Sequence, residues 1–128
     1  MPKAPKPVSL VLCQGMQVEP GAGRMSLVGV FNSLRFPSFP TPPQRFTVYA
    51  ALHGGDGQGT ITLTVSRAIT EAKIRQSQWW RGFSDPDLIT MFEGTVEKCV
   101  FPTAGRYLVT LRFDGEIVTQ RILDVFQE

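Results

Sequence analysis

The chain has 128 residues, with 13 basic and 11 acidic side chains and a formal net charge of +2. That length suffices for one domain with its own core, and no run approaches the roughly 20 apolar residues of a membrane helix. Lys3 and Lys6 lie in the Pro-rich start, so the remaining 11 basic residues equal the 11 acidic ones. These basic residues are scattered singly, which disfavours nucleic-acid binding because that function needs a clustered basic face.

The start of the chain predicts a flexible tail over residues 1–7, because alternating proline and lysine cannot bury enough surface to become ordered. Residues 8–128 then form a single domain. The basic start is followed by a short apolar run only, so no signal peptide is predicted and a cytoplasmic location is expected. Cys13 and Cys99 are accordingly predicted to be reduced, partly buried thiols, too few and too far apart to indicate a zinc site.

Plentiful proline and glycine, common β-branched residues and turns every eight to twelve residues are typical of an all-β protein. Strands are predicted over residues 8–13, 25–34, 45–53, 60–66, 72–80 and 88–99 and in a carboxy-terminal hairpin. Gly29 predicts a bulge or a close backbone approach within the second strand. The Pro-rich segment Phe36–Pro43 is interpreted as a crossover between sheets. We expect an immunoglobulin-like antiparallel β-sandwich of seven to nine strands, although other eight-stranded topologies fit the same pattern.

The carboxy-terminal hairpin is the clearest local signal. Inward alternation from Tyr107 to Phe113 is followed by Asp114-Gly115, a pair typical of a type I′ turn. In the last strand, Leu123 and Val125 lie on the opposite parity to Ile122. A bulge near Gln120-Arg121 and burial of both strand faces each explain this change of parity.

The segment Ala104–Val109 resembles the tyrosine corner of immunoglobulin-like sandwiches, in which a tyrosine bonds back to the preceding turn. Val109 stands where antibody domains have cysteine, so the resemblance is to relatives without the disulfide. The alternative is that Tyr107 lies half-buried in a hairpin and makes no such bond.

Catalytic and metal-binding patterns are weak. The one histidine, His53, lies at a strand end, and no serine stands in a GxSxG elbow. The glycine loop Gly54–Gly59 is followed by a strand, whereas a phosphate cradle needs a helix. The acidic pairs at 85/87 and 114/116 are explained by the preference of aspartate for turns. A calcium site would require the two pairs to lie close together, because the ion binds about six to eight oxygen atoms. We therefore expect no enzyme activity, no metal and no cofactor.

Trp79-Trp80 is the most informative candidate site. Neighbouring strand residues point to opposite faces, so Trp80 is predicted to point inward with Ile74 and Trp79 outward among arginines. An exposed tryptophan beside arginine is typical of an interaction hot spot and can also stack on a base or sugar ring. Alternatively, both rings belong to the core or the loop Gly82–Asp87 covers them. The predicted partner-binding residues are Trp79, Arg75, Arg81 and Phe83.

Several different short motifs are distributed along nearly the whole chain. They are Val11-Leu12-Cys13, Gly23–Phe31, Phe36–Pro40, Val48–Leu52, Phe101-Pro102, Gly105-Arg106-Tyr107 and Asp114-Gly115. In combination they resemble a family of short, uncharacterised bacterial proteins, a domain of unknown function. The resemblance implies an immunoglobulin-like sandwich without an assigned activity, and it carries over no catalytic residues.

The leading functional hypothesis is a non-catalytic interaction or accessory module that binds another protein. One alternative is a self-assembling structural subunit, because the neutral body and the sheet edges permit edge-to-edge pairing. Another is a small-ligand-binding sandwich that uses the Trp79/Trp80 region. The sequence does not identify the partner or the oligomeric state.

Overall fold

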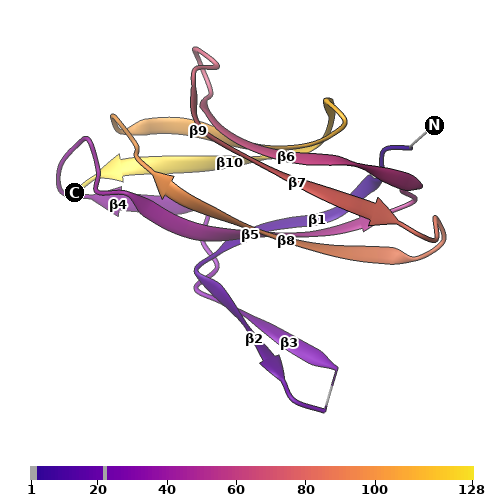
Figure 1. Ribbon diagram of the computed structural model, residues 1–128. Coiled ribbons are helices and arrows are strands. Elements are labelled where there is room, and N and C mark those ends of the chain that lie inside the picture. The colour runs from indigo at the N-terminus through magenta and orange to yellow at the C-terminus, as the bar shows by residue number, and fades with distance from the viewer. Residues whose placement is uncertain (1–2, 22) are drawn as a thin grey trace.

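The computed structural model describes residues 3–21 and 23–128, which form two packed β-sheets and a projecting hairpin (Figure 1). The larger sheet has the strand order β4-β10-β9-β6-β7, the smaller sheet has the order β1-β5-β8, and β2 pairs with β3. The strands are β1 Lys6–Cys13, β2 Gly15–Glu19, β3 Arg24–Val28, β4 Ser33–Phe36, β5 Gln44–His53, β6 Gly57–Arg67, β7 Lys73–Phe83, β8 Ile89–Cys99, β9 Gly105–Phe113 and β10 Glu116–Gln127. The all-β prediction is confirmed, but the sandwich is not wholly antiparallel as expected, because β4 runs parallel to β10. No helix in this part of the chain could cross a membrane.

The described residues contain ten strands, more than the seven to nine expected. The difference has two sources: β2 was not predicted, and the predicted strand over residues 25–34 breaks at Gly29. Gly29 has a φ of 65°, and a Cβ there would lie 2.7 Å from Cγ of Gln14. Before this glycine the chain forms β3 of the projecting hairpin, and after it the chain returns to the larger sheet as β4.

The amino-terminal segment differs from the predicted tail over residues 1–7, of which residues 1 and 2 lie outside the described part. The Lys3 N–H donates to the carbonyl of Asp56 at 2.8 Å, and the Asp56 N–H donates back at 3.1 Å. Pro5 is buried, and β1 already begins at Lys6. The segment thus pairs with the loop before β6, which supplies backbone partners that the composition does not reveal.

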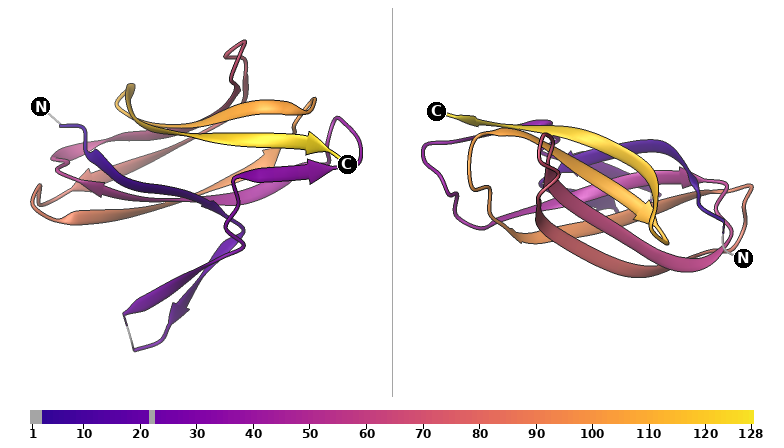
Figure 2. Two further views of the ribbon diagram at one scale, coloured as in Figure 1. Left: turned by 180° about the vertical axis from the view of Figure 1, so that it is seen from behind. Right: turned by 90° about the horizontal axis from the view of Figure 1, so that it is seen from above.

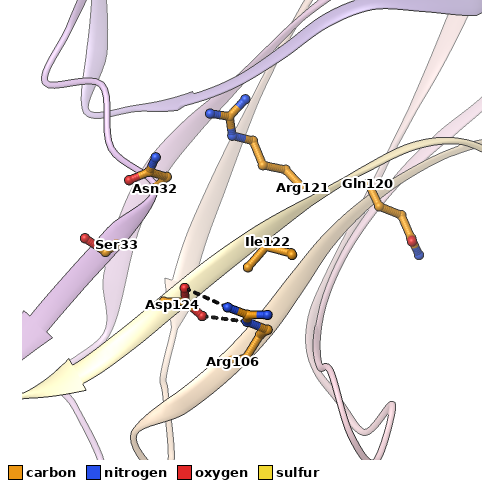
Figure 3. A pocket seen from close by; sticks show the side chains of 7 residues that line it. All are labelled: Asn32, Ser33, Arg106, Gln120, Arg121, Ile122 and Asp124. Carbon is orange, nitrogen blue, oxygen red and sulfur yellow. Dashed lines mark hydrogen bonds and ion pairs between the residues drawn. The ribbon is translucent and has the colours of Figure 1, made fainter.

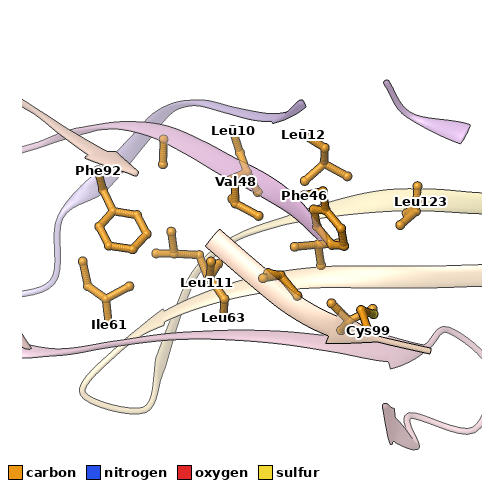
Figure 4. Packing of buried hydrophobic residues seen from close by; sticks show 14 of the residues in the cluster. Leu10, Leu12, Phe46, Val48, Ile61, Leu63, Phe92, Cys99, Leu111 and Leu123 are labelled. Carbon is orange, nitrogen blue, oxygen red and sulfur yellow. The ribbon is translucent and has the colours of Figure 1, made fainter. Parts of the chain in front are cut away.

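The core lies between the two sheets and is built from the predicted inward rows of β5, β6 and β9 (Figure 4). Leu12 and Val48 of the smaller sheet are fully buried, and Ile61, Leu63 and Val65 of β6 face them from the larger sheet, where Val65 pairs with the buried Val109 of β9. Strict alternation on three strands explains this arrangement, because residues of one parity share one face of a sheet. The predicted inward parity of these strands is therefore confirmed.

The carboxy-terminal hairpin contains the predicted turn and a bulge. Asp114 and Gly115 have φ values of 48° and 84°, as a type I′ turn requires. The register shifts between Ile117 and Thr119, so the bulge precedes the expected position near Gln120-Arg121. It brings Leu123 opposite Tyr107 in the core. One face of the strand is buried, not both.

The tyrosine corner is present as a hydrogen bond. The hydroxyl of Tyr107 donates to the carbonyl of Thr103 at 2.7 Å, while the ring packs edge-on against Phe101 with centroids 5.1 Å apart. This contact fixes the turn before β9 to the core. Of the two alternatives that the sequence left open for Tyr107, the bonded one is therefore present.

Tyr107→Phe is expected to lower the free energy of unfolding by about 1–2 kcal/mol, because the Thr103 carbonyl loses its donor. Urea denaturation followed by circular dichroism measures the change. The matched control is Tyr49→Phe, since the buried Tyr49 hydroxyl has no hydrogen-bond partner among the described residues. Equal losses in both variants would contradict a stabilising role for the corner.

Candidate interaction surfaces

The structure places the two tryptophans opposite to the prediction. Trp80 is the exposed one, with 63% of its surface accessible. Trp79 packs against the core, and its ring meets Phe92 edge-on with centroids 5.4 Å apart. The predicted outward orientation of Trp79 was therefore wrong.

A bulge at Ile74 explains the reversal. Arg75 pairs with Val65 and Lys73 pairs with Ser66, so Ile74 has no counterpart on β6. Ile74 and Trp79 both pack against the core, although a spacing of five residues would put them on opposite faces of a regular strand. The extra residue changes the phase of the alternation, and the sequence pattern contains no sign of it.

The predicted partner-binding residues do not form one exposed surface. Phe83 is buried and packs edge-on against Phe113 with centroids 5.4 Å apart. Arg75 is half-buried. Arg81 is exposed, with its guanidinium carbon 5.7 Å from the centre of the Phe92 ring. With Trp79 packed against the core and Phe83 buried, Arg81 is the one fully exposed residue among these four.

Trp80 instead stands at one end of a polar sheet face, called here the threonine–glutamine face. It lies beside Thr60 on the outer side of the larger sheet. Rows of paired residues continue along the sheet away from Trp80. The residues of the face are Trp80, Thr60, Gln78, Thr62, Arg112, Gln76, Thr64, Thr110 and Gln120.

The hairpin of β2 and β3, called here the arm, stands away from both sheets in Figure 1 and in the left view of Figure 2. Its root is fixed by two backbone bonds. The Gln14 N–H donates to the Val28 carbonyl at 2.9 Å, and the Phe31 N–H donates to the Leu12 carbonyl at 2.9 Å. The Phe31 ring then packs edge-on against Phe46 with centroids 5.8 Å apart. The direction of the arm is thus set by the body of the protein.

The arm has one apolar and one polar face. The cross-strand pairs alternate between the faces: Met16–Leu27 and Val18–Met25 lie on one face, and Gln17–Ser26 and Glu19–Arg24 lie on the other, which the Gly15–Val28 pair joins at the root of the arm. Val18 is 66% and Met25 38% exposed, while Glu19 and Arg24 form an ion pair at 3.1 Å. A two-stranded hairpin alone is marginally stable in water, so an exposed apolar face on it indicates a binding surface.

The sequence interpretation missed the four apolar residues of the arm. A usable signal was present, because apolar and polar residues alternate in Met16–Glu19 and again in Met25–Leu27. Glycine-rich residues 21–23 separate the two runs, as in a hairpin. Treating residues 25–34 as one strand concealed the pairing.

A third surface is an open hollow of about 550 Å³ beside β10 (Figure 3). It lies where β4 begins, because β4 pairs only with Asp124–Gln127 and leaves the edge of Glu116–Leu123 without a further strand in the described part of the chain. Its lining residues are Asn32, Ser33, Arg106, Gln120, Arg121, Ile122 and Asp124. A free strand edge can accept an added strand.

Charged groups at this hollow serve the fold. Arg106 donates two hydrogen bonds to Asp124, at 2.9 and 3.3 Å, and these bonds hold the pKa of the Asp124 carboxyl below its ordinary value. Arg121 reaches across to the smaller sheet and donates to the Leu10 carbonyl at 2.7 Å. These bonds tie β10 to β9 and to β1, and the residues of the hollow provide no evident nucleophile–base pair.

The acidic pairs considered for calcium are engaged in local structure. The Asp114 carboxylate accepts the Thr60 N–H at 2.8 Å, and the Asp85 carboxylate accepts the Asp87 N–H at 2.9 Å. Within residues 3–21 and 23–128, no three His, Cys, Asp or Glu side chains gather as metal ligands would. His53 is exposed at the end of β5.

Both cysteines are unpaired and fully buried. Burial raises the pKa of the Cys99 thiol to about 11, and the nearby Arg75 guanidinium counteracts part of this rise. Burial likewise raises the pKa of Cys13. The thiol is the less reactive form, so neither residue is suited to nucleophilic chemistry at neutral pH.

Native protein is therefore expected to react with a disulfide reagent at about pH 8 at least about a hundredfold more slowly than urea-unfolded protein. Because the folded state holds the Cys99 proton more tightly, its contribution to stability is present below the ordinary value of 9.0 and is lost as pH rises through about 11. Reagent absorbance gives the rate. A thiol that reacts equally fast in the folded protein would contradict the burial.

Comparison with curated proteins found no match. The model of a family of unknown function, DUF6941, matches residues 8–126. This match includes both sheets except for the ends of β1 and β10, and it also includes the arm. The chain therefore belongs to this family of unknown function (DUF6941).

Proposed function

We propose that the protein is a non-catalytic interaction module that binds another protein through the apolar face of its arm. The observation that carries this proposal is the unpartnered row of Met16, Val18, Met25 and Leu27 on a hairpin held away from the body. It replaces the Trp79-centred surface that the sequence suggested. The sandwich serves as the support that fixes the arm's position.

We further infer an immunoglobulin-like topology, for which the Tyr107–Thr103 bond and the two packed sheets provide support. The two unpaired thiols agree with a reducing, cytoplasmic compartment. A bacterial source remains an expectation from the motif resemblance.

The apolar side chains of the arm provide only a limited free energy of binding. Full burial of an aliphatic or methionine side chain contributes about 1.5–3 kcal/mol, and Met16 and Leu27 are already partly covered. Association costs roughly 4–15 kcal/mol in lost freedom. The arm therefore needs a partner with a preformed apolar groove, and its own fixed direction reduces the ordering cost.

The test uses a tagged protein in lysate of its native cells, with bound proteins quantified by mass spectrometry. We expect a partner that is lost when Val18 and Met25 are both replaced by glutamate. That partner should remain bound when Gln17 and Ser26, on the opposite face of the same strands, receive the same replacement. Recovery of the same proteins with both variants would contradict the proposal.

The free edge of β10 favours self-assembly as a second candidate. Two copies could pair their Glu116–Leu123 edges around a two-fold axis. Light scattering after size exclusion tests this directly: a dimer mass that Ile122→Pro reduces to the monomer mass supports it. A monomer mass at high concentration contradicts it.

A further inference from the structure

The threonine–glutamine face is unusual in its chemistry, because an exposed sheet face normally carries interspersed charges of both signs. Here the paired rows consist mainly of hydroxyl and amide side chains, with Arg112 as the charged member and the exposed Ile117 of β10 beside Arg112. Glu71 and Lys73 lie beyond its far end, where they border a hollow of about 250 Å³. The face therefore offers many neutral donors and acceptors and little net charge.

The side chains of this face form a layer across four neighbouring strands, β7, β6, β9 and β10. Arg112 donates to the Thr64 hydroxyl at 3.4 Å, and the Gln120 amide donates to the Thr110 hydroxyl at 3.2 Å. Thr64 and Thr110 are only 2% exposed although they point away from the core. The longer side chains thus lie over the threonines and are held in place before any ligand arrives.

Trp80 supplies an apolar platform at the other end of the face. It is 63% exposed, and it lies four residues along β7 from Gln76, or about 13 Å at the rise of a β-strand. Between them stands the row of Gln78, Thr62 and Arg112. A ligand that uses both ends must be longer than a single ring.

We propose that this face binds a neutral oligosaccharide. A sugar ring has an apolar face that can stack on Trp80, and its hydroxyls match the glutamine amides, the half-buried Thr60 and Thr62 hydroxyls and the Arg112 guanidinium. A nucleic acid fits less well, because its phosphates need several cations and this face provides Arg112 with Lys73 at its border. This site does not include the arm, so the sugar-binding proposal and the proposed protein interaction can be tested independently of each other.

The experiment titrates the full chain with cellohexaose, xylohexaose, maltohexaose and chitohexaose and follows tryptophan fluorescence and calorimetric heat. We expect saturable binding of at least one probe, weakened at least tenfold by Trp80→Ala and by Gln76→Ala, and largely retained by Trp80→Phe. Val18→Glu on the arm is the control and should bind like the unmodified chain. Circular dichroism establishes that each variant is folded.

Absence of saturation by all four sugars up to about 10 mM, which would fill even a millimolar site, overturns the proposal. Binding that Trp80→Ala leaves unchanged also overturns it, because the sugar then lies elsewhere. Tighter, Trp80-dependent binding of oligouridylate overturns it in favour of a nucleic-acid ligand.

Discussion

Trp79→Ala is expected to lower the free energy of unfolding by about 2–4 kcal/mol, slightly less than a fully buried tryptophan would lose. The ring packs against the core and meets Phe92 edge-on. Its terminal carbon Cη2 would lie 3.0 Å from a Cβ placed on Gly94, so the ring occupies the space beside that glycine. Truncation leaves a cavity that the surrounding strands can fill only in part.

The matched variant is Trp80→Ala, which removes the same side chain from the neighbouring position on the outer face. Because Trp80 is 63% exposed, its loss should change the free energy of unfolding by less than about 1 kcal/mol. Urea denaturation monitored by far-ultraviolet circular dichroism measures both values. If Trp80→Ala proves the more destabilising variant, the bulge at Ile74 and the orientation of β7 are wrong.

The double variant Val18→Glu with Met25→Glu is expected to remove partner binding while leaving the fold intact. Two carboxylates placed in an apolar interface must be desolvated without a partner charge, which we expect to cost about 3 kcal/mol or more, a loss of at least about a hundredfold in affinity. Stability should change by less than about 1 kcal/mol, because both side chains are exposed and contribute little to the core.

The control, Gln17→Glu with Ser26→Glu, adds the same charge to the same two strands on the polar face. It should bind within about threefold of the unmodified chain, a difference below about 1 kcal/mol. Calorimetry with the recovered partner gives both affinities. Equal weakening by the two variants would show that net charge, rather than the apolar face, determines binding.

Much of the fold could be predicted from local chemistry. Clean alternation fixed the inward parity of β5, β6 and β9, and Asp114-Gly115 fixed the type I′ turn. The tyrosine corner followed from Ala104–Val109 and exists as the Tyr107–Thr103 bond. Each of these features depends on residues that are close together in the sequence, so the local sequence pattern is enough to predict it.

The candidate site could not be predicted in the same way, because one bulge reverses every side chain beyond it. Ile74 has no counterpart on β6, and this single insertion moved Trp79 into the core and Trp80 to the surface. A bulge depends on the partner strand, which the pattern within one strand does not describe. The parity of β10 changes at Val118 for the same reason.

The arm was not predicted, because a glycine at position 29 is compatible with two different backbone structures. A glycine within an apolar run is compatible with a bulge or with a complete change of chain direction. The choice depends on Gln14, whose side chain occupies the space that a Cβ at Gly29 would need. Only the three-dimensional structure brings these two residues together.

The most direct test of the arm as the interaction surface is site-specific photo-crosslinking in native cells. A photoreactive amino acid is placed in turn at Val18 and Met25, on the apolar face, and at Gln17 and Ser26, on the polar face. We predict that the first two positions crosslink one common protein and that the other two do not. Crosslinks of equal yield from both faces, or from neither, would contradict the account.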